Sequence, residues 1–327
     1  MSKKNILITG SGGLVGRALK KVIEYNNNIY GDLLKYDLVY HDELLYNYIY
    51  LTSKDGDLTK EENVKRIFEL YKPDIVVHLA ANVGGLYKNM YKRAEMFEDN
   101  ILMNTYILKY SRIFKVKKII NILSTCIFPD NIQITEDNLH YGPPHPSNEG
   151  YAYAKRMVDI HSRILLEKND IKYINLVPTN LYGFYDNFNL EDSHVIPALI
   201  HKCYLAKSSG NKFIVAGNGS PRRQFLYSND FGRMIYKCII DDTITPGNYI
   251  CSPPKNTEIS IGEVAKLIAE TMNYDTELQF DTSLSNGQDK KTVSPSKIFE
   301  KMDFTDIKSG LQDTVFWFVD NYENIRK

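Results

Sequence analysis

Five side chains able to accept or donate a proton mark the middle of this 327-residue chain: Ser124, Cys126, Tyr151, Lys155 and His194. Tyr151 and Lys155 are four residues apart, so on a helix they share one face, and the ammonium is expected to lower the pKa of the phenol. Such a tyrosine can protonate a carbonyl oxygen that receives a hydride, with Ser124 as a second donor to the same oxygen. This set therefore indicates reduction of a ketone with a nicotinamide cofactor.

Cys126 and His194 add a second acid/base pair, which a simple reductase does not need. Cys126 follows Ser124 by two residues at the end of a predicted strand, where a thiolate could remove a proton from carbon next to a ketone. The other cysteines suit inert packing positions: Cys203, Cys238 and Cys251. His194 stands where a loop enters a helix, and the residues alone leave a catalytic role and an ordinary helix-entry role equally open. Two chemistries in one site are indicated.

The elements that must position these residues alternate between strand and helix. Apolar runs predict strands over 5–9, 48–52, 74–79, 118–123 and 173–177, and amphipathic spacing predicts helices over 14–24 and 61–71. Such strands separated by helices are typical of a doubly wound parallel Rossmann sheet, an α/β fold covered on both faces. We expect a cofactor-binding Rossmann domain over 1–182 plus about 225–252, and a smaller α/β substrate lobe over 183–224 plus 253–327.

The second half of the chain has longer loops and two clear helices. Ser260 and Glu263 match a capping box that starts a helix ending near Met272, and the last helix is predicted over 311–324, with Trp317 in it. Ligands bind at the carboxyl edge of doubly wound sheets. We therefore expect the second lobe to close over that edge.

A glycine-rich segment joins the first strand to the first helix. Gly10 permits a tight turn, Gly13 lets backbone N–H groups approach a pyrophosphate, and Gly16 allows the helix to pack closely on the strand. The expected cofactor-binding residues of this segment are Gly10, Ser11, Gly12, Gly13, Leu14, Val15 and Gly16.

The residues after the second strand favour NADP over NAD. Ser53 and Lys54 offer a hydroxyl and a cation for a 2′-phosphate, at a point where NAD enzymes carry an acidic residue, although Asp55 lies close by. Asp57 and Leu58 resemble the pair that contacts adenine. Further cofactor contacts are expected from Leu79, Ala80, Ala81, Tyr151, Lys155, Pro178, Asn180 and Leu181. Plain strand packing is the alternative for Leu79 to Ala81.

Composition excludes several other classes. Forty basic and forty acidic residues give a net charge of zero, so no field favours nucleic acid or a membrane surface. No apolar run approaches the roughly 20 residues that span a bilayer. Four scattered cysteines and no N-terminal signal segment predict a cytoplasmic protein with reduced thiols.

At these residues the chain resembles the GDP-L-fucose synthases, extended short-chain dehydrogenase/reductases that convert GDP-4-keto-6-deoxy-D-mannose to GDP-L-fucose. The likeness covers nearly the whole chain and rests on residues 10–16, 78–85, 123–129, 151–157, 178–183, 186–188 and 221–225. Two departures stand out. Phe184-Tyr185 replaces the usual Pro-His near the sugar pocket, and residues 26–50 match poorly.

The resemblance implies a bifunctional mechanism that needs no metal. Cys126 removes the protons on C3 and C5 in turn, and His194 reprotonates both centres from the opposite face. NADPH then supplies hydride to C4 while Tyr151 protonates the oxygen. The resemblance also implies a homodimer, paired through a helix bundle that includes the Tyr151 helix. The implied contacts to the GDP-sugar are Asn180, Lys202, Arg223 and Lys291.

Other functions remain open at the level of sequence. One is an enzyme that only reduces, or only epimerises, a related nucleotide sugar. A catalytically silent NADP-binding regulator is another, although the intact Tyr151 and Lys155 oppose it. A 4,6-dehydratase is disfavoured because that reaction needs an acidic residue near Cys126, and its neighbours Thr125 and Ile127 supply none.

Overall fold

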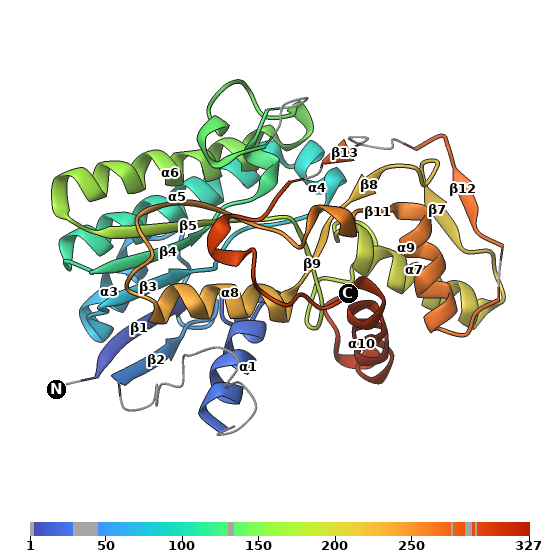
Figure 1. The fold of residues 1–327 in the computed structure, drawn as a ribbon, viewed down its shortest axis with the longest axis horizontal. Coiled ribbons are helices and arrows are strands. Elements are labelled where there is room, and N and C mark those ends of the chain that lie inside the picture. The colour runs from blue at the N-terminus through green and yellow to red at the C-terminus, as the bar shows by residue number, and fades with distance from the viewer. Residues whose placement is uncertain (1–2, 29–44, 130–133, 276, 285–289, 292) are drawn as a thin grey trace.

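The computed structural model describes residues 3–28, 45–129, 134–275, 277–284, 290–291 and 293–327. A central sheet of six parallel strands has the spatial order β10-β5-β4-β3-β1-β2 (Figure 1). The strands are β1 (Lys4–Thr9), β2 (Tyr46–Tyr50), β3 (Ile75–His78), β4 (Lys118–Ile122), β5 (Lys172–Pro178) and β10 (Gly247–Cys251). This arrangement confirms the predicted α/β fold class.

Helices cover both faces of the sheet. α1 (Leu14–Asn28) and α8 (Ser228–Ile240) pack on one face, and α3 (Glu61–Tyr71), α5 (Arg93–Ile113) and α6 (Glu149–Asn169) pack on the other (Figure 1). Strand residues alternate between faces, so Ile6 and Ile8 join the apolar cluster under α1 and α8, whereas Leu7 joins the cluster under α3, α5 and α6. A short helix, α4 (Leu86–Tyr91), precedes α5.

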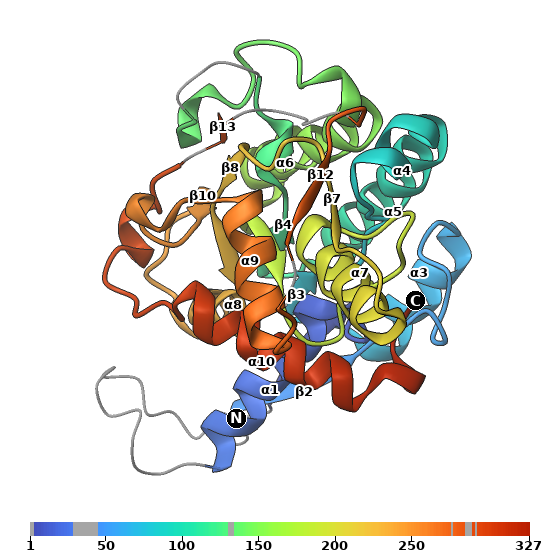
Figure 2. The same cartoon turned by 90° about the vertical axis from the view of Figure 1, so that its right-hand side faces the viewer.

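A third apolar cluster lies beyond the carboxyl ends of the strands (Figures 1 and 2). It is built mainly from α7 (Val195–Ser209), α9 (Ile261–Thr271) and α10 (Ile307–Asp320). Short strands complete this region: β6 (Asn180–Tyr182) with β9 (Phe225–Tyr227), β7 (Ile214–Ala216) with β12 (Gln279–Asp281), and β8 (Arg222–Arg223) between β11 (Ile259–Ser260) and β13 (Lys290–Lys291). The division of the chain into two domains stays a prediction.

Several element boundaries differ from the predicted ones. β2 begins two residues earlier than the predicted strand and also ends two residues earlier. α1 extends four residues further than predicted, to Asn28. α10 begins at Ile307 because the Asp306 carboxylate caps the N–H groups of Lys308 and Ser309, each at 3.1 Å. It ends at Asp320, ahead of a separate turn. The capping box of Ser260 and Glu263 is present as predicted.

A ladder of asparagine side chains crosses the sheet and fixes α6 to it. Asn121 on β4 donates to Asn175 on β5 (2.9 Å), which donates to Asn248 on β10 (3.0 Å). Asn248 donates to the buried carboxylate of Asp159 on α6 (2.9 Å), and Asn121 also donates to Ser162 of the same helix (3.2 Å). The helix that carries Tyr151 and Lys155 is therefore held by directed polar contacts as well as by apolar packing.

Among the described residues, no helix is long and apolar enough to cross a membrane.

Candidate active site

The glycine-rich turn lies at the switch point of the sheet, where the chain passes from β1 to β2 on one side and returns to β3 on the other. Gly10 has φ +67°, and a Cβ there would lie 2.7 Å from the Ala80 backbone nitrogen. A Cβ on Gly16 would lie 2.4 Å from the Ser11 Cα, so close packing requires this glycine too. Both expectations from sequence are confirmed.

Gly12 and Gly13 differ, because a Cβ at either position would have no protein atom nearer than 3.6 Å. The fold itself therefore leaves space above these two residues. α1 begins at Leu14, so the free N–H groups of its first turn face the same space. A backbone cradle open above a helix N-terminus fits the pyrophosphate of a dinucleotide.

The loop after β2 supports the expected preference for a 2′-phosphate. The Asp55 carboxylate oxygen Oδ2 accepts hydrogen bonds from the Thr52 N–H (2.7 Å) and the Thr52 hydroxyl (3.0 Å), so this carboxylate is occupied within its own loop. Ser53 and Lys54 are exposed. The Asp55 carboxylate, which argued against the NADP assignment, therefore stabilises its own loop.

Asp57 and Leu58, the predicted contacts to adenine, differ in their exposure to solvent. Asp57 is exposed, and hydrogen bonds from the Thr59 hydroxyl and N–H lower the pKa of its carboxyl. Leu58 is buried in the core cluster under α3 and α5, which leaves its backbone as the part available to a ligand.

A buried relay joins the carboxyl ends of β1 and β3. The Thr9 hydroxyl oxygen accepts from the backbone N–H groups of Leu79 and Ala80, each at 3.1 Å, so its proton points to His78 Nδ1 at 2.9 Å. His78 Nε2 then carries the ring proton and donates to Asn104 Oδ1 on α5 (3.0 Å). The predicted cofactor residues Leu79 and Ala80 are therefore held by side chains that sequence patterns did not single out.

Acid is expected to destabilise the protein through His78. Burial lowers the pKa of His78 to about 3, while the unfolded imidazole titrates near 6.5. Between these values the unfolded state binds the extra proton, so the free energy of unfolding falls by about 2 kcal/mol between pH 7 and pH 5 from this group. Urea unfolding at both pH values measures the loss, and His78→Gln should remove that part of it. An equal loss in the variant would contradict the assignment.

The strand end after β4 brings the predicted reductase residues together. Lys155 is buried, and its ammonium donates to the Ile122 carbonyl at the end of β4 (2.9 Å). Cys126 lies in the tight turn that follows, with its N–H donated to the Ser124 hydroxyl oxygen (3.3 Å). Arg156 of α6 ties down this turn by donating to the Ile127 carbonyl (2.6 Å).

The electrostatics of this cluster correct one expectation. The pKa of Tyr151 is raised by burial and by its electrostatic interaction with the nearby Cys126, so the predicted lowering by Lys155 is wrong. The Lys155 nitrogen lies 5.8 Å from the Tyr151 ring centroid and donates to a carbonyl, so it does not offset the burial. Burial also lowers the pKa of Lys155 to about 8. Tyr151 is therefore a neutral phenol, the form that can donate a proton.

Cys126 is the half-exposed member of the four free cysteines, and the other three are buried, as predicted. His194 is the residue immediately before α7. Solvent reaches its side chain, yet the surrounding protein lowers its pKa by desolvation. The loop that ends at His194 contacts the segment after β3, next to the strand whose end carries Cys126.

The predicted substrate residues lie on or beside the short strands and helix α7, outside the six-stranded central sheet. Asn180 donates to the Gln224 carbonyl (3.3 Å), next to Arg223, and β13 pairs with β8 so that Lys291 stands opposite Arg223 in the backbone register. Lys202 lies on α7, beside the β7–β12 pair, where Ser283 and then Lys202 lower the pKa of Asp281. Lys202 therefore lies on a helix beside the β7–β12 pair, whereas Arg223 is part of β8 in a different small sheet.

Gln224 is a residue that sequence analysis missed. Its buried side chain donates to the carbonyls of Pro253 and Val293, each at 3.0 Å, and accepts from the Val293 N–H (2.7 Å). The segments that carry Arg223 and Lys291 are thus joined through one amide. No sequence pattern signals such a contact between distant loops.

Phe184 and Tyr185, the departure from the usual Pro-His, join α1 to α10. Their rings lie 5.8 Å and 4.7 Å from the Trp317 ring. Arg17 of α1 lies over the Tyr185 ring at 4.3 Å, and Lys21 lies over Phe184 at 5.2 Å. The departure therefore has a structural explanation in these contacts. Of the poorly matched residues 26–50, those from 29 to 44 lie outside the described part of the chain.

Residues 6–249 match the family model described as the NAD dependent epimerase/dehydratase family, and the chain belongs to that family. It is 41% identical to a GDP-L-fucose synthase of Dictyostelium discoideum, over 100% of this chain and 98% of that protein. A probable GDP-L-fucose synthase of Drosophila melanogaster is 36% identical, over 99% and 100%. The resemblance stated from the motifs is thereby confirmed.

The structure is similar to the crystal structure of a GDP-L-fucose synthetase from Naegleria fowleri bound to NADP. The TM-score is 0.88 at 39% sequence identity, covering 100% of this chain and 98% of that one.

Proposed function

We propose that this protein makes GDP-L-fucose from GDP-4-keto-6-deoxy-D-mannose with NADPH, by epimerisation at C3 and C5 followed by reduction at C4. The observation that carries the proposal is the position of Cys126, in a turn that packs against α6 and close enough to Tyr151 and Lys155 to interact electrostatically with both. A thiol beside a reductase pair lets one ketone serve both steps, because the carbonyl acidifies the adjacent C–H bonds and is itself reduced afterwards.

In the epimerisation, the Cys126 thiolate takes the proton from C3 and later from C5, leaving an enolate whose charge sits on the C4 oxygen. Tyr151 and Ser124 stabilise that oxygen through hydrogen bonds. The His194 imidazolium donates a proton to the opposite face of each carbon, which inverts it. Desolvation lowers the pKa of His194 and makes this imidazolium a stronger acid than a free one.

In the reduction, NADPH held at this site would supply the hydride. Tyr151 donates its phenolic proton to the C4 oxygen, and its burial keeps that proton in place until the oxygen gains charge. Lys155, held by the Ile122 carbonyl, would contact the cofactor beside Tyr151. The residues that would hold the cofactor are the turn over 10–16, Ser53, Lys54, Asp57, Leu58, the strand ends at 79–81 and Pro178 to Leu181. Asn180, Arg223 and Lys291 would hold the GDP-sugar, with Lys202 the least supported contact.

Turnover in heavy water tests the proposal. The keto sugar and NADPH should yield GDP-L-fucose with deuterium at C3 and C5, as NMR of the product would show. A reduced sugar without deuterium at these carbons would contradict the epimerase step, exchange without NADPH oxidation would contradict the reductase step, and no turnover at all would favour an NADP-binding regulator.

Lys54 is expected to set the cofactor preference. Lys54→Ala should raise the KM for NADPH about tenfold by removing a cation from the 2′-phosphate. The KM for NADH should not change, since NADH lacks that phosphate. Steady-state kinetics with both cofactors measure the effect, and Lys60→Ala, an exposed lysine before α3, is the matched control. A similar rise for NADH would show that the loop is merely disturbed.

The outer surface of α5 and α6 supports a homodimer. Met157 and Ile164 are 40% and 49% exposed there and line a hollow between the two helices. We propose that a second copy covers this surface, and sedimentation would give the mass.

Four free thiols and the absence of a spanning helix among the described residues support a cytoplasmic location.

A further inference from the structure

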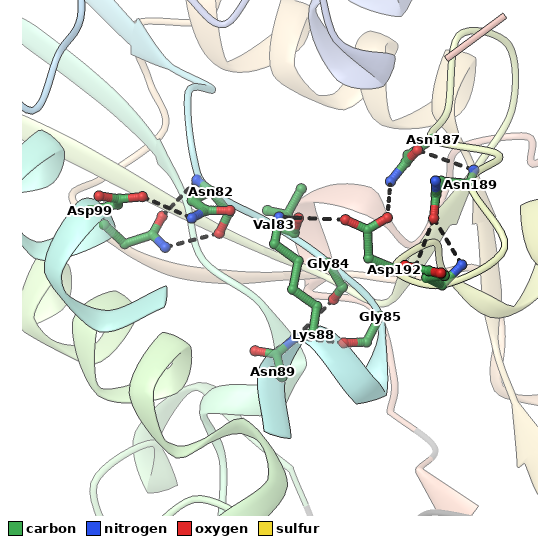
Figure 3. A network of polar contacts seen from close by, with 12 residues as sticks. Asn82, Val83, Gly84, Gly85, Lys88, Asn89, Asp99, Asn187, Asn189 and Asp192 are labelled. Atoms are coloured by element: carbon green, nitrogen blue, oxygen red, sulfur yellow. Dashed lines mark hydrogen bonds and ion pairs between the residues drawn. The ribbon is translucent and has the colours of Figure 1, made fainter. Parts of the chain in front are cut away.

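The loop that leads into His194 is closed by its own hydrogen bonds. The Asn189 side-chain oxygen accepts from the N–H groups of Glu191 (2.8 Å) and Asp192 (3.2 Å), and its backbone carbonyl accepts from the Ser193 N–H (3.2 Å). Asn187 donates to Asp192 Oδ1 at 3.3 Å. These hydrogen bonds join residues 187–193 into one connected loop (Figure 3). His194 is the next residue of the chain.

Asp192 is the point where this loop meets the segment after β3. Its backbone carbonyl accepts from the Gly85 N–H (2.8 Å), and its carboxylate oxygen Oδ2 lies 3.9 Å from the Lys88 ammonium (Figure 3). That ammonium also donates to the Val83 carbonyl (3.1 Å), and the Lys88 side chain is only 15% exposed. Backbone and side chain of Asp192 are thus both held by the segment after β3.

The segment after β3 is itself fixed. The Asn89 side chain donates to the carbonyls of Gly84 (2.8 Å) and Gly85 (3.0 Å). Asn82 exchanges hydrogen bonds with the buried Asn100 of α5, at 3.1 Å and 2.9 Å. A Cβ on Gly85 would lie 2.2 Å from the Ser193 carbonyl oxygen, so the two segments touch at backbone distance.

His194 has no comparable anchor of its own. Its carbonyl accepts from the Ala198 N–H (3.0 Å) as α7 begins, but its side chain makes no capping bond. Among the described contacts, none holds the imidazole directly. The place of the ring is therefore set by the backbone of the loop, and that backbone is set by Asp192.

We propose that Lys88 and Asp192 are positioning residues for His194, acting across the site to hold the epimerisation acid at its working distance from the sugar. The inference rests on the proposed role of His194. Neither residue touches the reacting atoms. Breaking their pair leaves the lysine ammonium without its carboxylate and frees the loop on one side, which displaces the acid while Tyr151 and Lys155 stay in place on α6.

The test separates proton exchange from hydride transfer. Deuterium incorporation at C3 and C5 is measured for Lys88→Met, Asp192→Asn and the double variant, beside reduction of the ketone already inverted at both carbons. We expect each single variant to lose about tenfold in exchange, the double variant to lose no more than either, and reduction to stay within about twofold. Lys88→Arg should recover most of the exchange. Lys92→Met, an exposed lysine after α4, is the control.

Exchange at the wild-type rate in both single variants, or equal losses of exchange and reduction, would overturn the inference. His194→Asn in the same series separates this from failure of the proposed function. Loss of exchange in His194→Asn with normal exchange in Lys88→Met overturns the positioning role alone. Normal exchange with inversion at C3 and C5 in His194→Asn overturns the acid role and the positioning role together.

Discussion

Replacement of Cys126 by serine is expected to slow deuterium exchange at C3 and C5 by about 10²- to 10⁴-fold, the range that a positioned general base contributes. A serine hydroxyl is almost never ionised near neutral pH, so the site loses its base while the side chain keeps nearly the same volume. The turn around it should persist, because it depends on the Cys126 N–H and on Arg156 rather than on the sulfur. NMR of the recovered keto sugar in heavy water measures the exchange.

Two controls accompany this variant. Cys203→Ala removes a thiol that is buried in the apolar cluster of α7, α9 and α10, and it should leave exchange intact. Reduction of the ketone already inverted at C3 and C5 should survive in Cys126→Ser, because Tyr151 and Lys155 are unchanged. Exchange at the normal rate in Cys126→Ser would mean that another group is the base.

Tyr151→Phe is expected to have the complementary effect, a loss of about 10²- to 10⁴-fold in reduction of the inverted ketone. The variant keeps the ring that lies near Lys155 but removes the phenolic proton that Tyr151 would give to the C4 oxygen. Exchange at C3 and C5 should fall far less, since Cys126 and His194 remain. NADPH absorbance follows the reduction, and mass spectrometry of the recovered sugar follows the exchange.

Tyr153→Phe is a matched control on the same helix. Its ring lies beside Arg156, 5.5 Å from the guanidinium carbon, so the variant tests whether loss of any hydroxyl in this turn of α6 is harmful. Equal losses in Tyr151→Phe and Tyr153→Phe would contradict the assigned proton donor. A fall in exchange as large as the fall in reduction would show that the two steps are not separable.

The sequence was a good guide where the signal is local. The apolar strands of a parallel sheet are buried on both faces, so runs such as 75–78 and 118–122 stand out without any tertiary information. The glycine turn is equally clear, because the positive φ of Gly10 and the close contacts of Gly16 with Ser11 both arise within one βα unit. These local rules were enough to predict the fold class.

Sequence patterns failed where burial and polarity are combined. α5 was not predicted, and one reason is that it buries Asn100, Asn104 and Ser111 alongside its apolar residues, which blurs the helical pattern. The raised pKa of Tyr151 was mispredicted because spacing alone does not show that Lys155 donates to Ile122. Asp192 and Gln224 act through distant loops, and only the folded chain brings those loops together.

The asparagine ladder has a consequence for how this sequence can change over time. Each amide donates to the next, and the series ends at Asp159, whose carboxylate can only accept, so one acidic residue dictates the orientation of all three amides. Substitution of one asparagine leaves a neighbour with a buried donor or acceptor unmet. These positions are therefore expected to show epistasis, with substitutions tolerated in combination and rejected singly. The asparagine ladder beneath the Tyr151 helix should consequently evolve as one unit.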